Sequence, residues 1–135
     1  FYARYMDDFV IITDGKEHAA EYRKAIEQEL ARIHLQLHPK KCRVVPVSRG
    51  FKWLGFRIRV KPSGKILVTL NKDKIYHERR KLKKMVRLAK SGKLPRETAD
   101  TSLRCWAAHA VHGNNYNVIK KMHEYYRNLW RDVNV

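Results

Sequence analysis

The sequence has few acidic residues and no long apolar run. Only 13 Asp and Glu stand against 30 Lys and Arg, which gives the 135 residues a formal net charge of +17. No run of apolar residues approaches the roughly 20 that a membrane-spanning helix needs, and no secretory signal is visible. Such an excess of positive charge favours a polyanionic partner, with nucleic acid ahead of an anionic membrane surface. We therefore expect a nucleic-acid-binding protein with no membrane partner.

Cysteine is also scarce, with Cys42 and Cys105 only. The two form no set of spaced pairs, which excludes a disulfide framework and indicates a reducing compartment, the cytoplasm. We expect both thiols to be buried. Apolar residues are periodic and make up 44% of the chain, enough for a packed core in one domain or two small lobes. The chain lacks an initiator Met and starts on a predicted strand, as an excised piece of a longer protein would.

Two of the few acids are adjacent, in the sequence Tyr5-Met6-Asp7-Asp8 between β-prone apolar runs. Successive strand side chains point to opposite faces, so two aspartates that reach one site belong at a hairpin tip. Mg²⁺ takes hard oxygen ligands and usually binds one or two carboxylates together with substrate phosphates. The pair therefore predicts a phosphoryl-transfer site. The alternative is an ordinary turn, where Asp is common.

Residues 14–45 predict a covering helix followed by a strand. Asp14 and Glu17 have the spacing of a capping box, and the apolar residues after them recur with a helical period. Pro39 forbids continuation of the helix, so we expect a turn that exposes Lys40 and Lys41 and then a strand over residues 43–45. The apolar stripe of the helix consists of Ala19, Tyr22, Ile26, Leu30 and Ile33.

Residues 51–70 alternate large apolar and basic side chains around turn signals, which predicts antiparallel hairpins. Beyond Asn71 the pattern changes to three helices. Ser91-Gly92 is expected to end the first, Gly113 to cap the second, and Asn114 or Asn115 to start the third. The predicted core stripes are Ile75, Leu82, Val86 and Ala89; then Leu103, Trp106, Ala107 and Ala110; then Val118, Met122, Tyr126 and Leu129.

Taken in order, these motifs resemble the reverse transcriptase family. Tyr5-Met6-Asp7-Asp8 is similar to the YxDD hairpin of the polymerase palm, and residues 35–41 to the next palm motif, which ends in Pro-x-Lys. Residues 51–56, with Leu54-Gly55 at their centre, are similar to the primer-grip hairpin, and the later helices to the thumb. Residues 102–116 look like the thumb of bacterial group II-intron-like enzymes, including diversity-generating retroelement and prophage types.

The resemblance implies an α+β fold in two parts. Residues 1–70 would form a partial polymerase palm, made of antiparallel hairpins plus a covering helix, and residues 71–135 a three-helix thumb. It also implies an RNA-directed DNA polymerase, a nucleotidyltransferase that makes complementary DNA from deoxynucleoside triphosphates on an RNA template with a DNA primer and two Mg²⁺ ions. An accessory protein of a retroelement is a further candidate partner.

Site roles follow from the same resemblance. Asp7 and Asp8 would bind metal, while Tyr5 and Met6 would line the primer terminus; strand packing is the alternative for Tyr5. Lys41 would approach the leaving pyrophosphate, with Lys40 or a merely solvated turn as alternatives. Primer-grip roles fall to Phe51, Trp53, Leu54 and Gly55, although Phe51, Trp53 and Phe56 equally suit core packing.

The first thumb helix carries a further predicted role. It has no acid between Glu78 and Glu97, so helical ion pairs cannot offset its charge, and we expect it to follow a phosphate backbone. The expected backbone contacts are Arg79, Arg80, Lys83, Lys84, Arg87 and Lys90.

Two palm motifs of the family, which supply another metal-binding Asp and hold the nucleotide and template, have no counterpart in this sequence. The chain alone is therefore expected not to polymerise. The alternative function is a non-catalytic, maturase-like RNA-binding module, and a structural basic domain explains the charge but not the motifs. Cys105, His109 and His112 raise the question of zinc, but three ligands beside packed apolar residues do not favour it.

Overall fold

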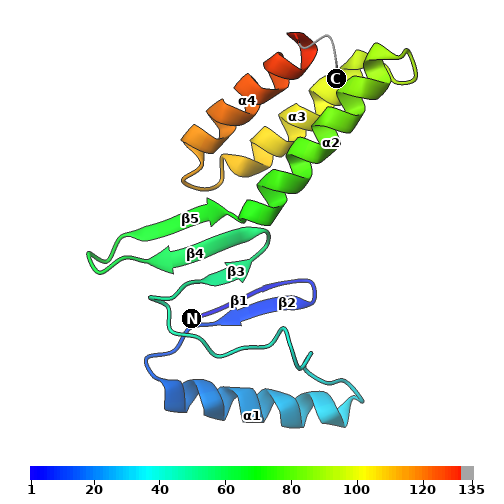
Figure 1. Ribbon diagram of the computed structural model, residues 1–135. Coiled ribbons are helices and arrows are strands. Elements are labelled where there is room, and N and C mark those ends of the chain that lie inside the picture. Colours follow the sequence, from blue (N-terminus) through cyan, green and yellow to red (C-terminus); the bar gives the residue numbers. More distant parts are fainter. Residues whose placement is uncertain (132–135) are drawn as a thin grey trace.

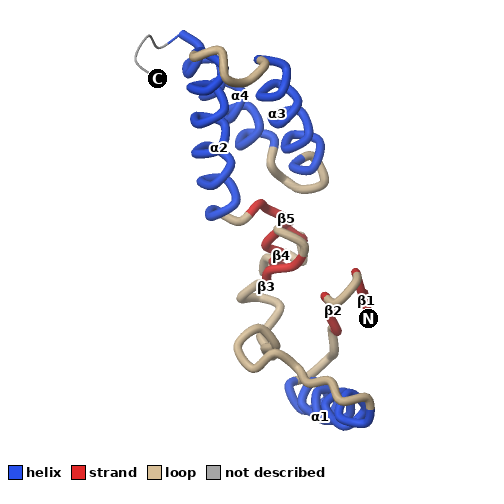
Figure 2. Tube along the Cα trace, turned by 90° about the vertical axis from the view of Figure 1, so that its right-hand side faces the viewer, coloured by secondary structure: helices blue, strands red, loops and turns tan. Residues whose placement is uncertain are grey.

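Two small antiparallel sheets and four helices make up this α+β fold (Figure 1). The computed structural model describes residues 1–131, so residues 132–135 of the predicted thumb lie outside the described part. From bottom to top of Figure 1 lie helix α1, the β1–β2 hairpin, the three-stranded sheet and helices α2–α4, and Figure 2 shows the same order from the side. The predicted fold class is confirmed.

The first sheet is a hairpin of β1 (Tyr2–Tyr5) and β2 (Asp8–Ile11). Tyr5 lies opposite Asp8 and Tyr2 opposite Ile11, so only Met6 and Asp7 form the turn. The prediction of a hairpin tip at the acidic pair is therefore confirmed.

Helix α1 (Lys16–Arg32) forms where predicted but begins differently. Gly15 is the N-cap and no side chain caps the helix. The Asp14 carboxylate instead contacts His18 Nδ1 at 2.8 Å. The predicted capping box is wrong because the helix starts one residue late for it, which puts Asp14 within reach of the His18 ring. No residue of α1 is buried.

The strand predicted over residues 43–45 is not present. Residues 33–50 are irregular apart from short turns, in one of which the Lys41 and Cys42 N–H groups donate to His38 O. A strand needs a partner for its backbone groups, and none of the described strands pairs with this segment. Pro46, which has no N–H, follows directly.

The second sheet is the meander β3 (Phe51–Trp53), β4 (Phe56–Val60) and β5 (Ile66–Leu70). Its hairpins confirm the prediction for residues 51–70. Phe56 pairs with Leu70, and both are buried against Ala110 of the helical lobe. The apolar face of the sheet therefore packs on the helices.

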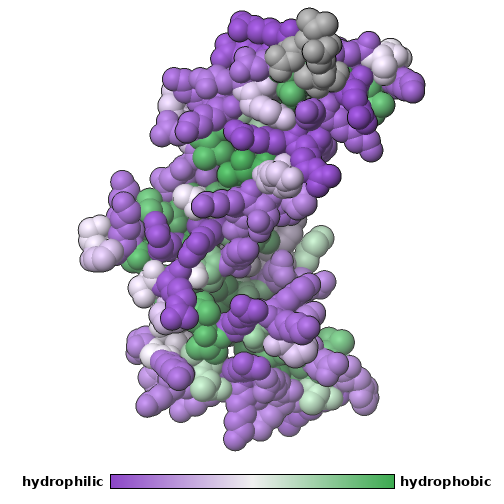
Figure 3. Space-filling view, viewed as in Figure 1, coloured by the Kyte–Doolittle hydropathy of each residue, from purple (hydrophilic) through white to green (hydrophobic). Residues whose placement is uncertain are grey.

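The helices α2 (Lys72–Lys90), α3 (Arg96–Ala110) and α4 (Tyr116–Arg131) hold the main core. All three predicted stripes face inward, and no described residue before Phe56 is buried. Hydrophilic residues cover most of the face in Figure 3, and none of the described helices is long and apolar enough to span a membrane. The main core consists of Leu82, Val86, Ala99, Leu103, Met122, Tyr126 and Leu129.

Of the two predicted caps in the loop before α4, Gly113 is wrong, whereas α4 does begin directly after Asn115, whose backbone O accepts from Ile119 N–H at 2.9 Å. The C-cap of α3 is Val111 rather than Gly113, and a Cβ on Gly113 would lie 2.6 Å from Val68 O of β5. Asn115 directly precedes α4, but its side chain bonds to Leu70 of β5 and to Ala110 O. This loop is shaped by contact with the sheet, which local sequence rules do not include.

Candidate functional site

The acidic pair lies at the exposed tip of the first hairpin. Asp7 is a turn residue, and Asp8 is the first residue of β2, on the same face as Tyr5. Both carboxylates are exposed, and neither forms a hydrogen bond or ion pair with another of residues 1–131. Two adjacent, unpartnered carboxylates repel one another, and a cation between them removes that repulsion. The tip is thus chemically suited to a hard metal ion.

The turn is held in a conformation that favours glycine. Met6 has φ 51, in the left-handed region, where a residue with a Cβ costs about 1–2 kcal/mol. Arg4 Nε donates to Met6 O at 2.8 Å and so braces the turn from β1. Sequence reasoning missed Arg4, because its role depends on the hairpin register. Backbone strain of this kind is typical of functional sites.

Asp7 and Asp8 fit Mg²⁺ only in part. Mg²⁺ commonly takes one or two protein carboxylates and completes its octahedron with phosphate oxygens and water. Within residues 1–131 no group of three or more His, Cys, Asp or Glu is placed to hold a metal. Cys105, His109 and His112, which raised the question of zinc, therefore do not form such a group either. Any two-ion site built on Asp7 and Asp8 therefore needs additional ligands.

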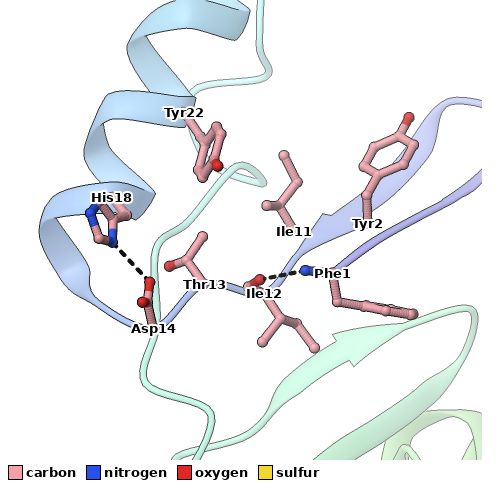
Figure 4. A pocket seen from close by; sticks show the side chains of 8 residues that line it. All are labelled: Phe1, Tyr2, Ile11, Ile12, Thr13, Asp14, His18 and Tyr22. Atoms are coloured by element: carbon pink, nitrogen blue, oxygen red, sulfur yellow. Dashed lines mark hydrogen bonds and ion pairs between the residues drawn. The ribbon is translucent and has the colours of Figure 1, made fainter.

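A hollow of the described chain lies away from this tip. It is about 660 Å³, between α1 and the open end of the hairpin, where the Phe1 amino group donates to Ile12 O at 2.9 Å (Figure 4). Tyr22 and His18 of α1 point toward it. Neither Asp7 nor Asp8 lines it, so it is not part of the acidic site.

The second hairpin presents the Leu54-Gly55 turn on the same side of the molecule as the acidic tip (Figure 1). Leu54 has φ 48 and Gly55 φ 84, so both central residues are left-handed, as a type I′ turn requires. Phe51 and Trp53 of β3 are half-buried, and the Trp53 indole N–H is buried with no hydrogen-bond partner among residues 1–131. The aromatic side chains are therefore at least partly packing residues.

His109 of α3 lies beside this turn. Its ring is 4.7 Å from that of Phe56, and its Nε2 would lie 3.7 Å from a Cβ built on Gly55. His109 is exposed, so the helical lobe adds a polar ring at the edge of the hairpin. In the sequence His109 stood out as a zinc candidate and as one of the thumb-like residues 102–116, but its proximity to Gly55 arises from packing between distant segments and was not predicted.

Lys40 and Lys41 lie in the irregular segment after α1. Both are exposed, and neither ammonium group has an ion-pair partner among the described residues. Lys40 O accepts a hydrogen bond from Arg43 Nε at 3.0 Å, which helps to fix the turn. No described contact joins either lysine to Asp7 or Asp8. Cys42, in the same turn, is half-buried and Cys105 is exposed, so the prediction of two buried thiols is wrong.

Helix α2 presents most of its predicted basic side chains to solvent. Lys83, Lys84 and Arg87 are exposed and have no hydrogen-bond, ion-pair or ring partner within residues 1–131. Two other basic side chains of α2 contact helix α4. The Arg79 guanidinium lies 5.1 Å from the Tyr125 ring centroid, and Lys90 Nζ donates to Leu129 O at 2.8 Å. The remaining member, Arg80, lies over Tyr76.

Residues 1–58 match the family described as reverse transcriptase (RNA-dependent DNA polymerase). The matched segment runs from β1 into β4, and so includes the acidic tip, the Lys40-Lys41 turn and the Leu54-Gly55 turn. No curated protein matches the chain. Residues 1–58 are therefore similar to reverse transcriptases, and the helical lobe lies outside the match.

Proposed function

We propose that this chain is the carboxy-terminal palm and thumb of an RNA-directed DNA polymerase. In this proposal residues 1–70 are palm and residues 71–135 thumb, and the enzyme belongs to a bacterial, group II-intron-like retroelement and acts in the cytoplasm. Its substrates are deoxynucleoside triphosphates, an RNA template and a DNA primer. The kind of retroelement that encodes the enzyme, and any accessory protein, depend on the subtype to which the enzyme belongs.

One observation carries the proposal. Asp7 and Asp8 project from the exposed tip of a two-residue turn inside the segment that matches reverse transcriptases. A pure nucleic-acid binder gains nothing from two unpartnered carboxylates, because they repel phosphate. A divalent cation bound between a carboxylate and a phosphate replaces this repulsion with attraction.

The reaction assigns a task to each part of this site. The primer 3′-hydroxyl loses its proton to water as its oxygen attacks the α-phosphorus of the nucleotide, a new P–O bond forms, and the bond from the α-phosphorus to the bridging oxygen breaks to release pyrophosphate. Asp7 and Asp8 would hold Mg²⁺, which would supply positive charge that stabilises the negative charge developing in the displacement. Lys41, or Lys40, would give a proton or positive charge to the pyrophosphate.

The primer strand requires support on both sides of the reacting atoms. Tyr5 and Met6 would line the primer terminus. The backbone of the Leu54-Gly55 turn, with Phe51 and Trp53 behind it, would approach the primer from the second hairpin. The exposed cations of α2 would follow the duplex backbone.

A complete two-ion site needs a carboxylate beyond these two. Asp14 contacts His18, Asp73 contacts Lys52, and Asp100 accepts from Tyr126, so these acids are committed elsewhere. We accordingly propose that the isolated chain binds primer–template but does not extend it. Extension needs the further palm residues that the translated reading frame would supply.

The decisive experiment is primer extension by the full reading frame on an RNA template with Mg²⁺. We expect Asp7→Asn to abolish extension, because the neutral amide cannot hold the ion. Asp14→Asn is the matched control, since Asp14 is an exposed Asp near the open end of the same hairpin. Extension by Asp7→Asn at the wild-type rate would exclude a metal site at this tip.

The second candidate function is a non-catalytic, maturase-like module that grips RNA. The net charge of +17 and the lack of a third placed metal ligand in the described chain favour it. If the wild-type reading frame binds primer–template and extends nothing, this candidate replaces the polymerase.

A further inference from the structure

The outer face of the three-stranded sheet carries a second group of basic side chains, in addition to those of helix α2. Since strand side chains alternate, the residues between the apolar positions of β3 and β4 face away from the helices. These are Lys52, Arg57 and Arg59, and all three are exposed. Thr69 and Leu67 of β5 lie opposite Arg57 and Arg59 and complete the face.

This face is cationic at an energetic cost to the fold. Lys52 lies directly opposite Arg57 across β3 and β4, and like charges in that position destabilise a sheet. No Asp or Glu occurs between Glu29 and Asp73, so the sequence offers no local compensation. The only described ion pair of the face joins Lys52 Nζ to Asp73 at 3.7 Å, and both side chains are exposed.

The two arginines are positioned and left uncovered. Arg57 Nη2 donates to Arg49 O at 3.1 Å, which holds that guanidinium in place. Gly50 has φ 78, and a Cβ there would lie 3.1 Å from Arg59 Cβ and 3.5 Å from Arg57 Nε. The nearest atom to that Cβ would be Ile58 O at 2.8 Å, so glycine at residue 50 lets the backbone run this close to β4. A shallow hollow of about 120 Å³ lies among Arg57, Arg59, Leu67 and Thr69.

We propose that this sheet face, made of Lys52, Arg57, Arg59 and Thr69, is a second binding surface for a nucleic-acid phosphate backbone. Arginine matches phosphate with its planar fork of donors, and the Thr69 hydroxyl adds a neutral donor of the kind that contacts phosphates. Arg57 and Arg59 are two residues apart on one strand, about 7 Å, and can contact separate phosphates. The helices pack on the opposite face of the sheet, and the one described contact of this surface with α2 is the Lys52–Asp73 ion pair.

The test is the salt dependence of binding by the 135-residue chain. Fluorescence anisotropy would be measured with a labelled RNA–DNA duplex and with a labelled single-stranded RNA of the same length. Each phosphate contact adds about 0.9 to the slope of log affinity against log salt on a duplex, and about 0.7 on a single strand. We expect Arg57→Gln/Arg59→Gln to lower the slope by about 2 on a duplex or about 1.4 on a single strand.

The matched control is Arg23→Gln/Arg32→Gln on α1. It removes the same charge, but these arginines pair with Glu27 and Glu29. We expect the control to keep the wild-type slope on both probes. A charge-retaining variant, Arg57→Lys/Arg59→Lys, should also keep most of the slope, which separates lost phosphate contacts from a disturbed sheet.

A reduced slope on either probe, confined to Arg57→Gln/Arg59→Gln, supports the proposal. A wild-type slope on both probes would overturn it and assign the face to an acidic protein instead. An equal reduction of the slope in the α1 control, Arg23→Gln/Arg32→Gln, would also overturn the proposal. The outcome does not depend on polymerisation, because no step uses Asp7, a metal ion or a nucleotide.

Discussion

Asn115 Oδ1 accepts a hydrogen bond from the Leu70 backbone N–H at 2.9 Å, which joins the loop before α4 to strand β5. Its Nδ2 donates to Ala110 O at 2.9 Å, so one side chain that is 1% exposed links β5, α3 and α4. Asn114 repeats the pattern: its Oδ1 accepts from Val68 N and its N–H donates to Val68 O. The open edge of β5 is thereby hydrogen-bonded at Val68 and Leu70, and the helical lobe is fixed to the sheet that carries the Leu54-Gly55 turn.

Replacing Asn115 with Ala should destabilise the chain strongly. The substitution leaves the Leu70 N–H and Ala110 O buried without partners, and each such group costs about 1–3 kcal/mol. We expect a loss of about 3 kcal/mol in the free energy of unfolding, measured by urea denaturation with tryptophan fluorescence. Asn114→Ala is the control, with an expected loss of about 1 kcal/mol because that side chain is exposed. Equal losses would contradict the role given to burial.

The close approach of Gly113 to β5 makes a second prediction. A Cβ at residue 113 would lie 2.6 Å from Val68 O and 2.7 Å from Asn115 Nδ2, so Gly113→Ala must move the loop or the strand. We expect a loss of about 2 kcal/mol, within the range for overpacking. Gly15→Ala is the matched control, because no atom lies within 4 Å of its Cβ position. A melting temperature of Gly113→Ala at or above that of Gly15→Ala would show that the loop has room.

The pattern of correct and wrong predictions has a physical basis. The helices and hairpins were predicted because they depend on side-chain periodicity and turn residues within a short window. The strand at residues 43–45 failed because its existence depends on a pairing partner. The C-cap role of Gly113 failed, and the side-chain bonds of Asn115 were not predicted, because this loop contacts β5, which is more than 40 residues earlier in the chain.

The candidate site was likewise predicted where it depends on local sequence and missed where it depends on distant contacts. Its acidic tip could be predicted, since adjacent Asp residues between β-prone runs are a local signal. The bracing of Met6 by Arg4 depends on hairpin register. The approach of His109 to Gly55 depends on the packing of α3 against the second sheet, so no motif in the sequence indicates either contact.

Tyr126 should make stability sensitive to alkaline pH. Its hydroxyl donates to Asp100 Oδ1 at 2.7 Å, and burial together with this bond raises its pKa from 10.0 to about 12. Because the folded pKa is the higher one, the contribution is complete below pH 10 and is lost as pH rises toward 12. We expect wild type to exceed Tyr126→Phe in unfolding free energy by about 1 kcal/mol at neutral pH. The difference should shrink through that window.

The check is urea denaturation of both proteins across this pH range, with phenolate absorbance followed in parallel. Comparing the two proteins cancels the titration of the lysines and of the other tyrosines. One of the seven tyrosines should titrate late in wild type and be missing from Tyr126→Phe. A stability difference that stays constant up to pH 12 would show that the Tyr126 pKa is not raised.

The two turn lysines should differ in catalysis under the proposed function. If Lys41 supplies a proton or charge to pyrophosphate, Lys41→Ala in the full reading frame should slow single-turnover nucleotide addition by about 10²-fold. Lys40→Ala is the matched control and should remain near the wild-type rate. The reverse result would transfer the role to Lys40. Two near-wild-type rates would make both side chains solvated turn residues.

The Leu54-Gly55 turn should show opposite effects on stability and function. At φ 48 Leu54 is in a region that Asn tolerates far better, and Asn-Gly is the favoured pair for a type I′ turn. We expect Leu54→Asn to raise the free energy of unfolding by about 1 kcal/mol. It should also lower primer extension by the full reading frame, since the proposed primer contact of Leu54 is lost. Leu54→Ala removes the same side chain without easing the backbone, so it should lose extension without gaining stability. Full primer extension by both variants would mean that Leu54 does not contact the primer. A lower free energy of unfolding for Leu54→Asn than for Leu54→Ala would mean that the turn is not strained.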